Sequence, residues 1–455
     1  MAALPERKIE IVRMLVSSAP DKVVGSLQQA LSGTSDSSAL GSVRRLVEDE
    51  VAERTLRNRI LAPVVAMFEG DGDDPHALTF PARALPPLWR GLRATEEATI
   101  EEARAALEDQ ERPQLLTEVL EKLTQSAAQG IRDREVEGYR VAAEACDAAK
   151  PSGSEALAGC LDIAPIVRRA SDRMSEWLTH QGSETTAAAR LAFKDAVQVA
   201  DDAGPRFFQM LAAQLPRRWM VLRIISAVMD KPTERYLADS ELGGFAEKVL
   251  DDVDGLLHRV AHLDVDAGPE AGREAASFVE LAVQQVHALE DSIDLKRDHG
   301  WGQRIHKQRT ELAGIVERRL RAAEKAAIEA LPMQRQRAHK AARLAPCLDD
   351  PPEPRLRARA MTLLTFADAV QMTANYGGFA SARAKLIEDL GEYVDHYVEE
   401  VVDRVRLDEA PDRDIAADYL KAAADFSQLL RGPKAGDLVR RRAHAALHPE
   451  ASQAG

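Results

Sequence analysis

The residues from Leu386 to Val402 carry apolar side chains at the spacing of an α-helix, with acidic residues such as Glu388 and Glu399 between them. Because one helical turn takes about 3.6 residues, side chains at this spacing gather on a single face. The pattern excludes a strand here and predicts a long helix that faces a protein core. The apolar positions are Leu386, Ile387, Leu390, Tyr393, Val394, Tyr397, Val398, Val401 and Val402.

The same spacing recurs along most of the chain, with a second clear stripe from Phe245 to Leu263. The apolar content is dominated by Ala, Leu and Val, and aromatic residues make up only 4% of the chain. Alanine is the best helix former, whereas aromatic residues favour strands. The sequence contains no convincing strand alternation. We therefore expect an all-α fold, built as a multi-helix bundle or as an irregular α-solenoid.

Proline and glycine residues predict where the helices begin and end. The segment Ser18–Asp21 resembles a helix start, with Ser18 as the N-cap, a proline in the first turn and an acid at the third position. Gly33 and Gly377 lie where the apolar pattern breaks, as helix-ending glycines do.

Breaks in the pattern also suggest a division into domains, since 455 residues exceed the size at which one core usually stops growing. The strongest break is Pro346–Pro354, and Lys150–Ser154 is a further one. Ser32–Ser38 and Glu69–Pro75 read as polar linkers. We expect an N-terminal helical domain at 1–150, a central helical domain at 151–349 and a C-terminal helical region at 350–455.

Short internal similarities raise the question of a repeat. Residues Leu191–Val199 match Leu364–Met372, and Phe278–Gln284 keeps much of the pattern roughly halfway between them. Leu85–Arg93 also matches Leu215–Arg223, but at a different offset. Two interpretations stay open: degenerate internal repeats, or unrelated helices in an alanine- and valine-rich chain.

Charge and cysteine content bear on the cellular setting. The formal net charge of −14 disfavours a general attraction to nucleic acid or to anionic membranes. The three cysteines, Cys146, Cys160 and Cys347, are an odd number without CxxC spacing, which fits a reducing compartment. No run approaches the ~18 apolar residues of a membrane span. We expect a cytoplasmic protein without a membrane span.

Motifs for common catalytic sites are absent from the sequence. There is no GxxxxGK, GxGxxG, GxSxG or HExxH, and none of the eleven histidines has a glutamate three residues before it, as a di-iron bundle requires. We therefore assign no catalytic residue, cofactor or metal ligand, and we favour a protein that is not an enzyme.

Two acidic clusters leave one enzymatic alternative open. Asp251-Asp252 and Glu290-Asp291-x2-Asp294 superficially resemble the aspartate-rich motifs of isoprenoid synthases, although the first reads DDVD and not DDxxD. The alternative is a magnesium-dependent helical enzyme that uses the acids near 251 and 291. His258 and His262 have chelating spacing, but the apolar stripe places them on the solvent-facing side.

A basic stretch from Arg304 to Arg343 contains eleven Lys and Arg residues against four Glu. Read as a basic helix, it would bind a protein partner, an anionic surface or duplex nucleic acid, since aromatic residues for stacking on single strands are missing. A simpler interpretation pairs it with the twelve acids of Glu388–Asp418. The candidate binding residues are Arg304, Lys307, Arg309, Arg318, Arg319, Arg321, Arg335, Arg337, Lys340 and Arg343.

The leading hypothesis for function is a non-catalytic helical scaffold or adaptor that binds a protein partner, because helical arrays offer large surfaces without specialised residues. The identity of that partner is not readable from the sequence. Nucleic-acid binding through the basic stretch and the magnesium-dependent enzyme remain the alternatives.

Overall fold

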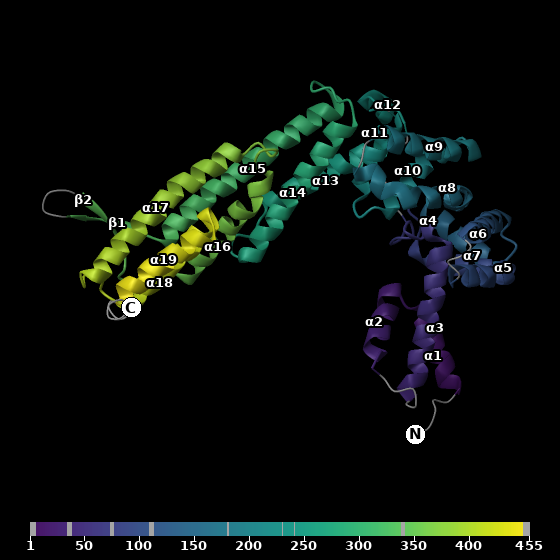
Figure 1. The fold of residues 1–455 in the computed structure, drawn as a ribbon, viewed down its shortest axis with the longest axis horizontal. Coiled ribbons are helices and arrows are strands. Elements are labelled where there is room, and N and C mark those ends of the chain that lie inside the picture. The colour runs from purple at the N-terminus through teal and green to yellow at the C-terminus, as the bar shows by residue number, and fades with distance from the viewer. Residues whose placement is uncertain are drawn as a thin grey trace. The chain divides into compact units, whose positions relative to one another are not determined.

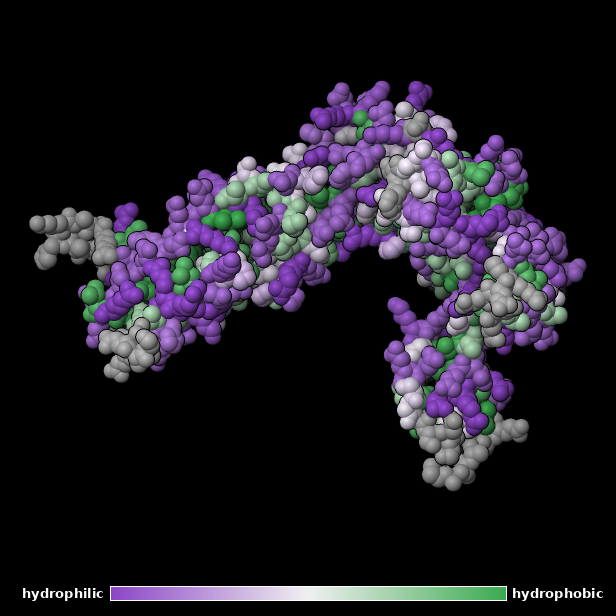
Figure 2. All heavy atoms as spheres, viewed as in Figure 1, coloured by the Kyte–Doolittle hydropathy of each residue, from purple (hydrophilic) through white to green (hydrophobic). Residues whose placement is uncertain are grey.

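The computed structural model describes residues 6–33, 39–72, 77–108, 113–179, 182–229, 231–240, 242–337 and 342–448. Throughout these ranges the chain is helical apart from short connections and one two-stranded hairpin (Figure 1). The expected all-α fold is confirmed. On the face drawn in Figure 2, hydrophilic residues cover most of the surface and hydrophobic residues lie in small groups. No helix in the described ranges is both long and apolar enough to cross a lipid bilayer.

The chain forms two compact units, Met1–Pro232 with Ser240–Phe245, and Thr233–Asp239 with Ala246–Gly455. The expected boundaries near 150 and 350 lie inside these units, and the three-domain division stays a prediction. The helices of the first unit are α1 (Glu6–Ser18), α2 (Asp21–Leu31), α3 (Ala39–Ile60), α4 (Ala62–Val65), α5 (Leu85–Glu108), α6 (Pro113–Asp133), α7 (Glu137–Ala149), α8 (Gly153–Thr179), α9 (Ser183–Val199), α10 (Ala203–Gln214) and α11 (Val221–Met229), with the 3-10 turns η1 (Ala82–Ala84) and η2 (Arg218–Met220).

The first three helices share a small core of their own, formed by Val16, Val24 and Val47. Arg54 on α3 joins them, because its guanidinium donates to the Val16 carbonyl at 2.9 Å and to the Asp21 carboxylate at 2.6 Å. The expected helix start at Ser18 is displaced: Ser18 ends α1, and α2 begins at Asp21.

Helices α5 to α8 form the larger core of the first unit. Tyr139 of α7 is 2% exposed, and its hydroxyl lies 3.1 Å from that of Thr95 on α5. Its ring lies so close to Gly130 on α6 that a Cβ atom there would come within 2.2 Å of it. Cys146 and Cys160 are buried, and burial raises the pKa of each thiol to about 12.

The second unit contains most of the predicted amphipathic stripes. Its helices are α12 (Glu234–Ala238), α13 (Gly243–Ala261, from Ala246 on), α14 (Pro269–Ser292), α15 (Gly300–Ala330), α16 (Pro354–Ala369), α17 (Ala380–Arg406), α18 (Arg413–Arg431) and α19 (Pro433–Leu447), with the 3-10 turn η3 (Val370–Thr373). The stripes at Leu386–Val402 and Phe245–Leu263 are confirmed as the buried faces of α17 and α13.

Within this unit α16 packs against α14 and α15, and α18 packs against α17 and α19. Gly272 of α14 lies against the backbone of α16, where a Cβ atom would meet the Thr362 carbonyl oxygen at 2.3 Å. The residues on both sides of Pro346–Pro354 therefore share one core. The prolines interrupt the helices but do not separate the packing.

The basic stretch is not a single helix, and that expectation is wrong beyond Ala330. α15 ends there, just before Pro332, because proline cannot donate the next helical hydrogen bond and restricts the residue before it. Two antiparallel strands follow, β1 (Met333–Arg337) and β2 (Ala342–Pro346), paired with Arg335 opposite Leu344. With the sequences MQRQR and ARLAP, these short strands lack the regular apolar alternation that would have revealed them.

The internal repeat stays a prediction. The two matching segments lie in α9 and in α16 with η3. Their surroundings differ, since Leu364 is 1% exposed whereas the matching Leu191 is 60% exposed. Of the expected linkers, residues 34–38 and 73–75 lie outside the described ranges.

Candidate functional site

The acidic clusters and the basic stretch meet inside the second unit. Arg304 on α15 donates from Nη2 to Asp251 Oδ1 at 2.6 Å and to Asp254 Oδ2 at 2.5 Å, both on α13. Burial lowers the pKa of Arg304, but these hydrogen bonds outweigh that effect and leave the pKa above its ordinary value. The carboxylates proposed for magnesium near 251 therefore already have a permanent cation beside them.

A second pair joins α15 to α14. Arg309 donates from Nη1 to both carboxylate oxygens of Glu290, at 2.9 and 3.1 Å. Its Nη2 atom donates to the Tyr376 carbonyl at 3.4 Å, in the segment between η3 and α17. Arg309 thus holds three parts of the second unit in register.

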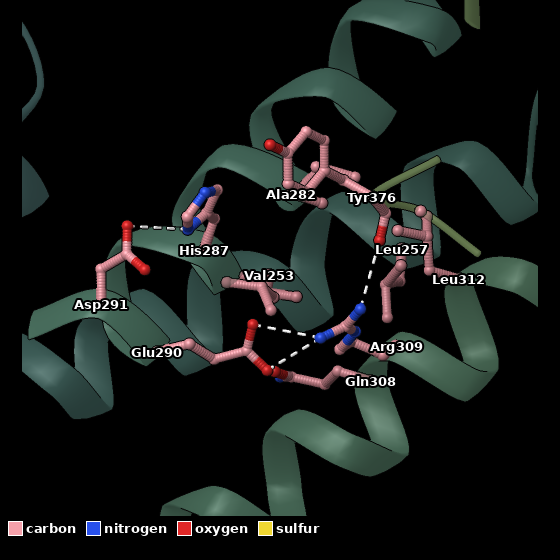
Figure 3. A pocket seen from close by; sticks show the side chains of 13 residues that line it. Val253, Leu257, Ala282, His287, Glu290, Asp291, Gln308, Arg309, Leu312 and Tyr376 are labelled. Carbon is pink, nitrogen blue, oxygen red and sulfur yellow. Dashed lines mark hydrogen bonds and ion pairs between the residues drawn. The ribbon is translucent and has the colours of Figure 1, made fainter. Parts of the chain in front are cut away.

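Beside this pair lies a partly open pocket of about 250 Å³ (Figure 3). Its apolar wall comes from α13, α14 and α15, and its polar residues come from α14, α15 and the segment before α17. The apolar residues are Val253, Leu257, Ala282, Val283, Val286 and Leu312, and the polar ones are His287, Glu290, Asp291, Gln308, Arg309 and Tyr376.

His287 and Tyr376 form one edge of the pocket. The Nδ1 atom of His287 lies 2.9 Å from Asp291 Oδ2, and its ring stacks on Tyr376 with centroids 5.3 Å apart. A neutral His287 that donates from Nδ1 to Asp291 presents Nε2 as an acceptor. Asp291 therefore orients the imidazole and leaves its second nitrogen available.

Gln308 is a polar residue in the buried face of α15, only 2% exposed. Its Nε2 atom donates to the Leu250 carbonyl at 2.8 Å and to Asp254 Oδ1 at 2.6 Å. Its Oε1 atom has no hydrogen-bond partner among the described residues. A buried acceptor without a donor is costly, so this oxygen favours the entry of a donor.

The segment that contributes Tyr376 to the pocket carries two large exposed side chains, of which Tyr376 lines the pocket and Met372 precedes it by one turn of chain. Met372 is 87% exposed and Tyr376 is 62% exposed. A second hollow, of about 670 Å³, lies on the other side of the Arg309–Glu290 pair and shares both residues and Gly377 with the first. We name the first pocket with Met372 and Tyr376 the anchor surface.

The structure distributes the seven candidate cations whose side chains it describes instead of gathering them on one face. Lys307, Arg318 and Arg321 are exposed on α15, and Arg335 is exposed on β1. Arg319 donates to the carbonyl of Ala261 at the end of α13, and its burial together with Arg318 lowers its pKa. The side chains of Arg337 and Arg343 and the whole of Lys340 lie outside the described part of the chain.

The pairing of the basic stretch with Glu388–Asp418 stays a prediction, because the side chains of Arg337, Lys340 and Arg343 lie outside the described part of the chain. Within that part, Arg304 and Arg309 bind acids of α13 and α14. The reason is packing: those carboxylates face the same side of α15 that Gln308 and Leu312 bury.

His258 of α13 and His262, just after the end of that helix, are exposed, as the stripe predicted. Their rings stack with centroids 4.0 Å apart, and His262 Nδ1 lies 2.8 Å from the His258 carbonyl. Across the ranges that the structure describes, no three His, Cys, Asp or Glu residues are grouped so as to hold a metal ion.

Sequence reasoning missed Gln308, His287 and Tyr376. One signal was available, since Gln308 occupies an apolar position of the α15 stripe between Ile305 and Leu312. The approach of Tyr376 to His287 depends on packing between helices that are distant in sequence, which no local pattern reports.

Comparison with known proteins adds no assignment to this geometry. No protein-family model, no curated protein and no solved structure matches the chain.

Proposed function

We propose that this protein is a non-catalytic helical adaptor that binds a protein partner through the anchor surface. The observation that carries the proposal is the exposure of Tyr376 at a pocket with an apolar wall, in the same short segment as the exposed Met372. Tyr and Met are enriched at the cores of protein interfaces, and binding energy concentrates in a few such side chains that fit pockets.

The size of the pocket supports a protein partner over a free small molecule. Its volume of about 250 Å³ lies below the ~300–1,000 Å³ usual for small-molecule sites. One side chain of a partner fits such a volume. Met372 and Tyr376 would contact the partner residues next to that side chain. The rigid helices α13, α14 and α15 hold the wall in place.

The proposal is tested by replacing Met372 with the photo-crosslinking residue p-benzoylphenylalanine and illuminating the protein in extracts of its host. The cross-linked partner is then purified and its affinity is measured by calorimetry. Tyr376→Ala is expected to weaken binding by about tenfold or more, since truncating a central interface residue costs about 1–2 kcal/mol or more.

Leu407→Ala is the matched control, because Leu407 is also a large apolar residue, 67% exposed, in the second unit but not in the pocket. Its affinity for the partner is expected to equal that of the wild type. Equal binding by Tyr376→Ala and the wild type would refute the role of the anchor surface.

A second candidate function is duplex nucleic-acid binding by the β1–β2 hairpin. The residues from Ala330 to Leu348 include Arg335, Arg337 and Arg343 but no acid, and a two-stranded ribbon fits the major groove of DNA. Basic residues on such a ribbon would neutralise phosphates.

This candidate predicts salt-sensitive retention on duplex DNA that depends on the hairpin. The triple variant Arg335→Glu, Arg337→Glu and Arg343→Glu is expected to abolish retention at low salt. The triple variant Lys307→Glu, Arg318→Glu and Arg321→Glu changes the net charge equally on the exposed side of α15 and is expected to retain binding. Equal loss in both variants would show that only net charge matters, and absence of wild-type binding would dispose of the candidate.

A further inference from the structure

We infer that the group entering the pocket of the anchor surface is the cationic end of an arginine or lysine side chain of the partner. This inference rests on the proposed function and specifies its chemistry. It follows from the hydrogen-bonding capacity of the pocket, from its charge and from its apolar wall.

The free hydrogen-bonding capacity of the pocket consists mainly of acceptors. Gln308 Oε1 is buried and unpartnered within the described residues, and the carboxylates of Glu290 and Asp291 lie at the same pocket. Carboxylates accept hydrogen bonds at several lone pairs, so one existing donor each leaves capacity unused. A ligand that brings several N–H donors satisfies these oxygens together.

The charge of the pocket agrees with this capacity. With the His287 imidazole neutral, two carboxylates, Glu290 and Asp291, stand against one guanidinium, Arg309. Arg309 is already engaged by Glu290 and by the Tyr376 carbonyl. An anionic ligand would therefore meet two like charges and a largely occupied cation, whereas a cationic ligand restores neutrality.

The apolar wall suits the alkyl stem of the same side chain. Val253, Leu257 and Leu312 offer apolar surface to methylene groups, as long basic side chains require. The Tyr376 ring at the rim offers a face for a cation–π contact. A purely apolar side chain would fill the same wall but would leave Gln308 Oε1 without a donor.

The test uses a phage-displayed library of random peptides that is panned on the full-length protein. Clones that bind the wild type but not Tyr376→Ala define ligands of the anchor surface. We expect Arg or Lys at one fixed position in these clones. In a synthetic peptide, replacing that Arg by its neutral isostere citrulline, or that Lys by norleucine, is expected to weaken binding about tenfold or more, as a lost charged hydrogen bond would.

A protein variant checks that the cation reaches the pocket. Glu290→Gln is expected to weaken binding of the cationic peptide but to leave the affinity for its neutral counterpart unchanged. The control is Glu311→Gln, because Glu311 is an exposed acid of α15 outside the pocket. It should change neither affinity. Circular dichroism confirms that each variant is folded.

The two failures are distinguishable. Tyr376-dependent clones without a fixed cation, or equal affinities for the cationic and neutral peptides, would overturn the inference and leave the proposed function standing. A library that yields no Tyr376-dependent clone would overturn the proposed function itself.

Discussion

Gly272→Ala is expected to destabilise the second unit by about 2 kcal/mol, even though alanine is the better helix former. The added Cβ atom would lie 2.3 Å from the Thr362 carbonyl oxygen and 3.2 Å from the Phe366 nitrogen. Both contacts are backbone atoms of α16, which cannot rotate away as a side chain would. Relief requires α14 and α16 to move apart, and the packing between them is lost.

Hydrogen exchange followed by mass spectrometry measures this effect by region. Faster exchange is expected in α14 and α16 of Gly272→Ala, with α5 to α8 unchanged. Gly255→Ala is the matched control, because nothing lies within 4 Å of a Cβ atom on Gly255 of α13. There the same substitution should stabilise the helix by up to about 1 kcal/mol. Stability equal to wild type in Gly272→Ala would contradict the close approach of the two helices.

Arg54→Met is expected to release α1 and α2 from α3, with a local loss of about 2–3 kcal/mol. The guanidinium of Arg54 donates to Glu50 at 2.7 Å, to Asp21 at 2.6 Å and to the carbonyls of Val16 and Ala19 at 2.9 and 2.8 Å. Methionine fills a similar volume but donates to none of these oxygens. The core beneath is small, so few apolar contacts remain to hold the two helices.

Limited proteolysis gives a direct measure of that release. Cleavage between α1 and α2 should be much faster in Arg54→Met than in the wild type, while the second unit remains resistant. Arg13→Met is the control, since the exposed pair of Arg13 with Glu10 lies within one helix and contributes little. Equal cleavage rates for Arg54→Met and the wild type would show that the core alone holds these helices.

The sequence predicted those elements whose side chains alternate between core and solvent with a helical period. α17 and α13 are such elements, because their stripes are long and their opposite faces are charged. The hairpin after α15 escaped prediction because neither of its strands, MQRQR and ARLAP, alternates apolar and polar residues regularly, and because its register depends on pairing. Asp21 lies in the first turn of a helix, as its residue type suggested. The sequence did not reveal that its carboxylate is bound by Arg54 and Arg57 of α3.

The anchor surface was less accessible to sequence reasoning than the fold. The basic stretch and the acidic clusters are visible in the sequence as separate candidate sites. In the structure they pair with each other, Arg304 with Asp251 and Arg309 with Glu290. Charges that are distant in sequence cancel only when helix packing brings them together. A polar residue in an apolar stripe, as at Gln308, was the one local sign of the pocket.

The hydrogen bonds of Arg54 to α1 and α2 can form only after α3 has been synthesised. Val16 precedes Arg54 by 38 residues, so α1 leaves the peptidyl transferase centre well before the side chain that binds its last turn. At about 5–20 residues per second this interval lasts roughly 2–8 s. The nascent chain therefore carries the apolar residues Val16 and Val24 uncovered until α3 has emerged, and chaperones that bind exposed apolar segments have that time to act on it.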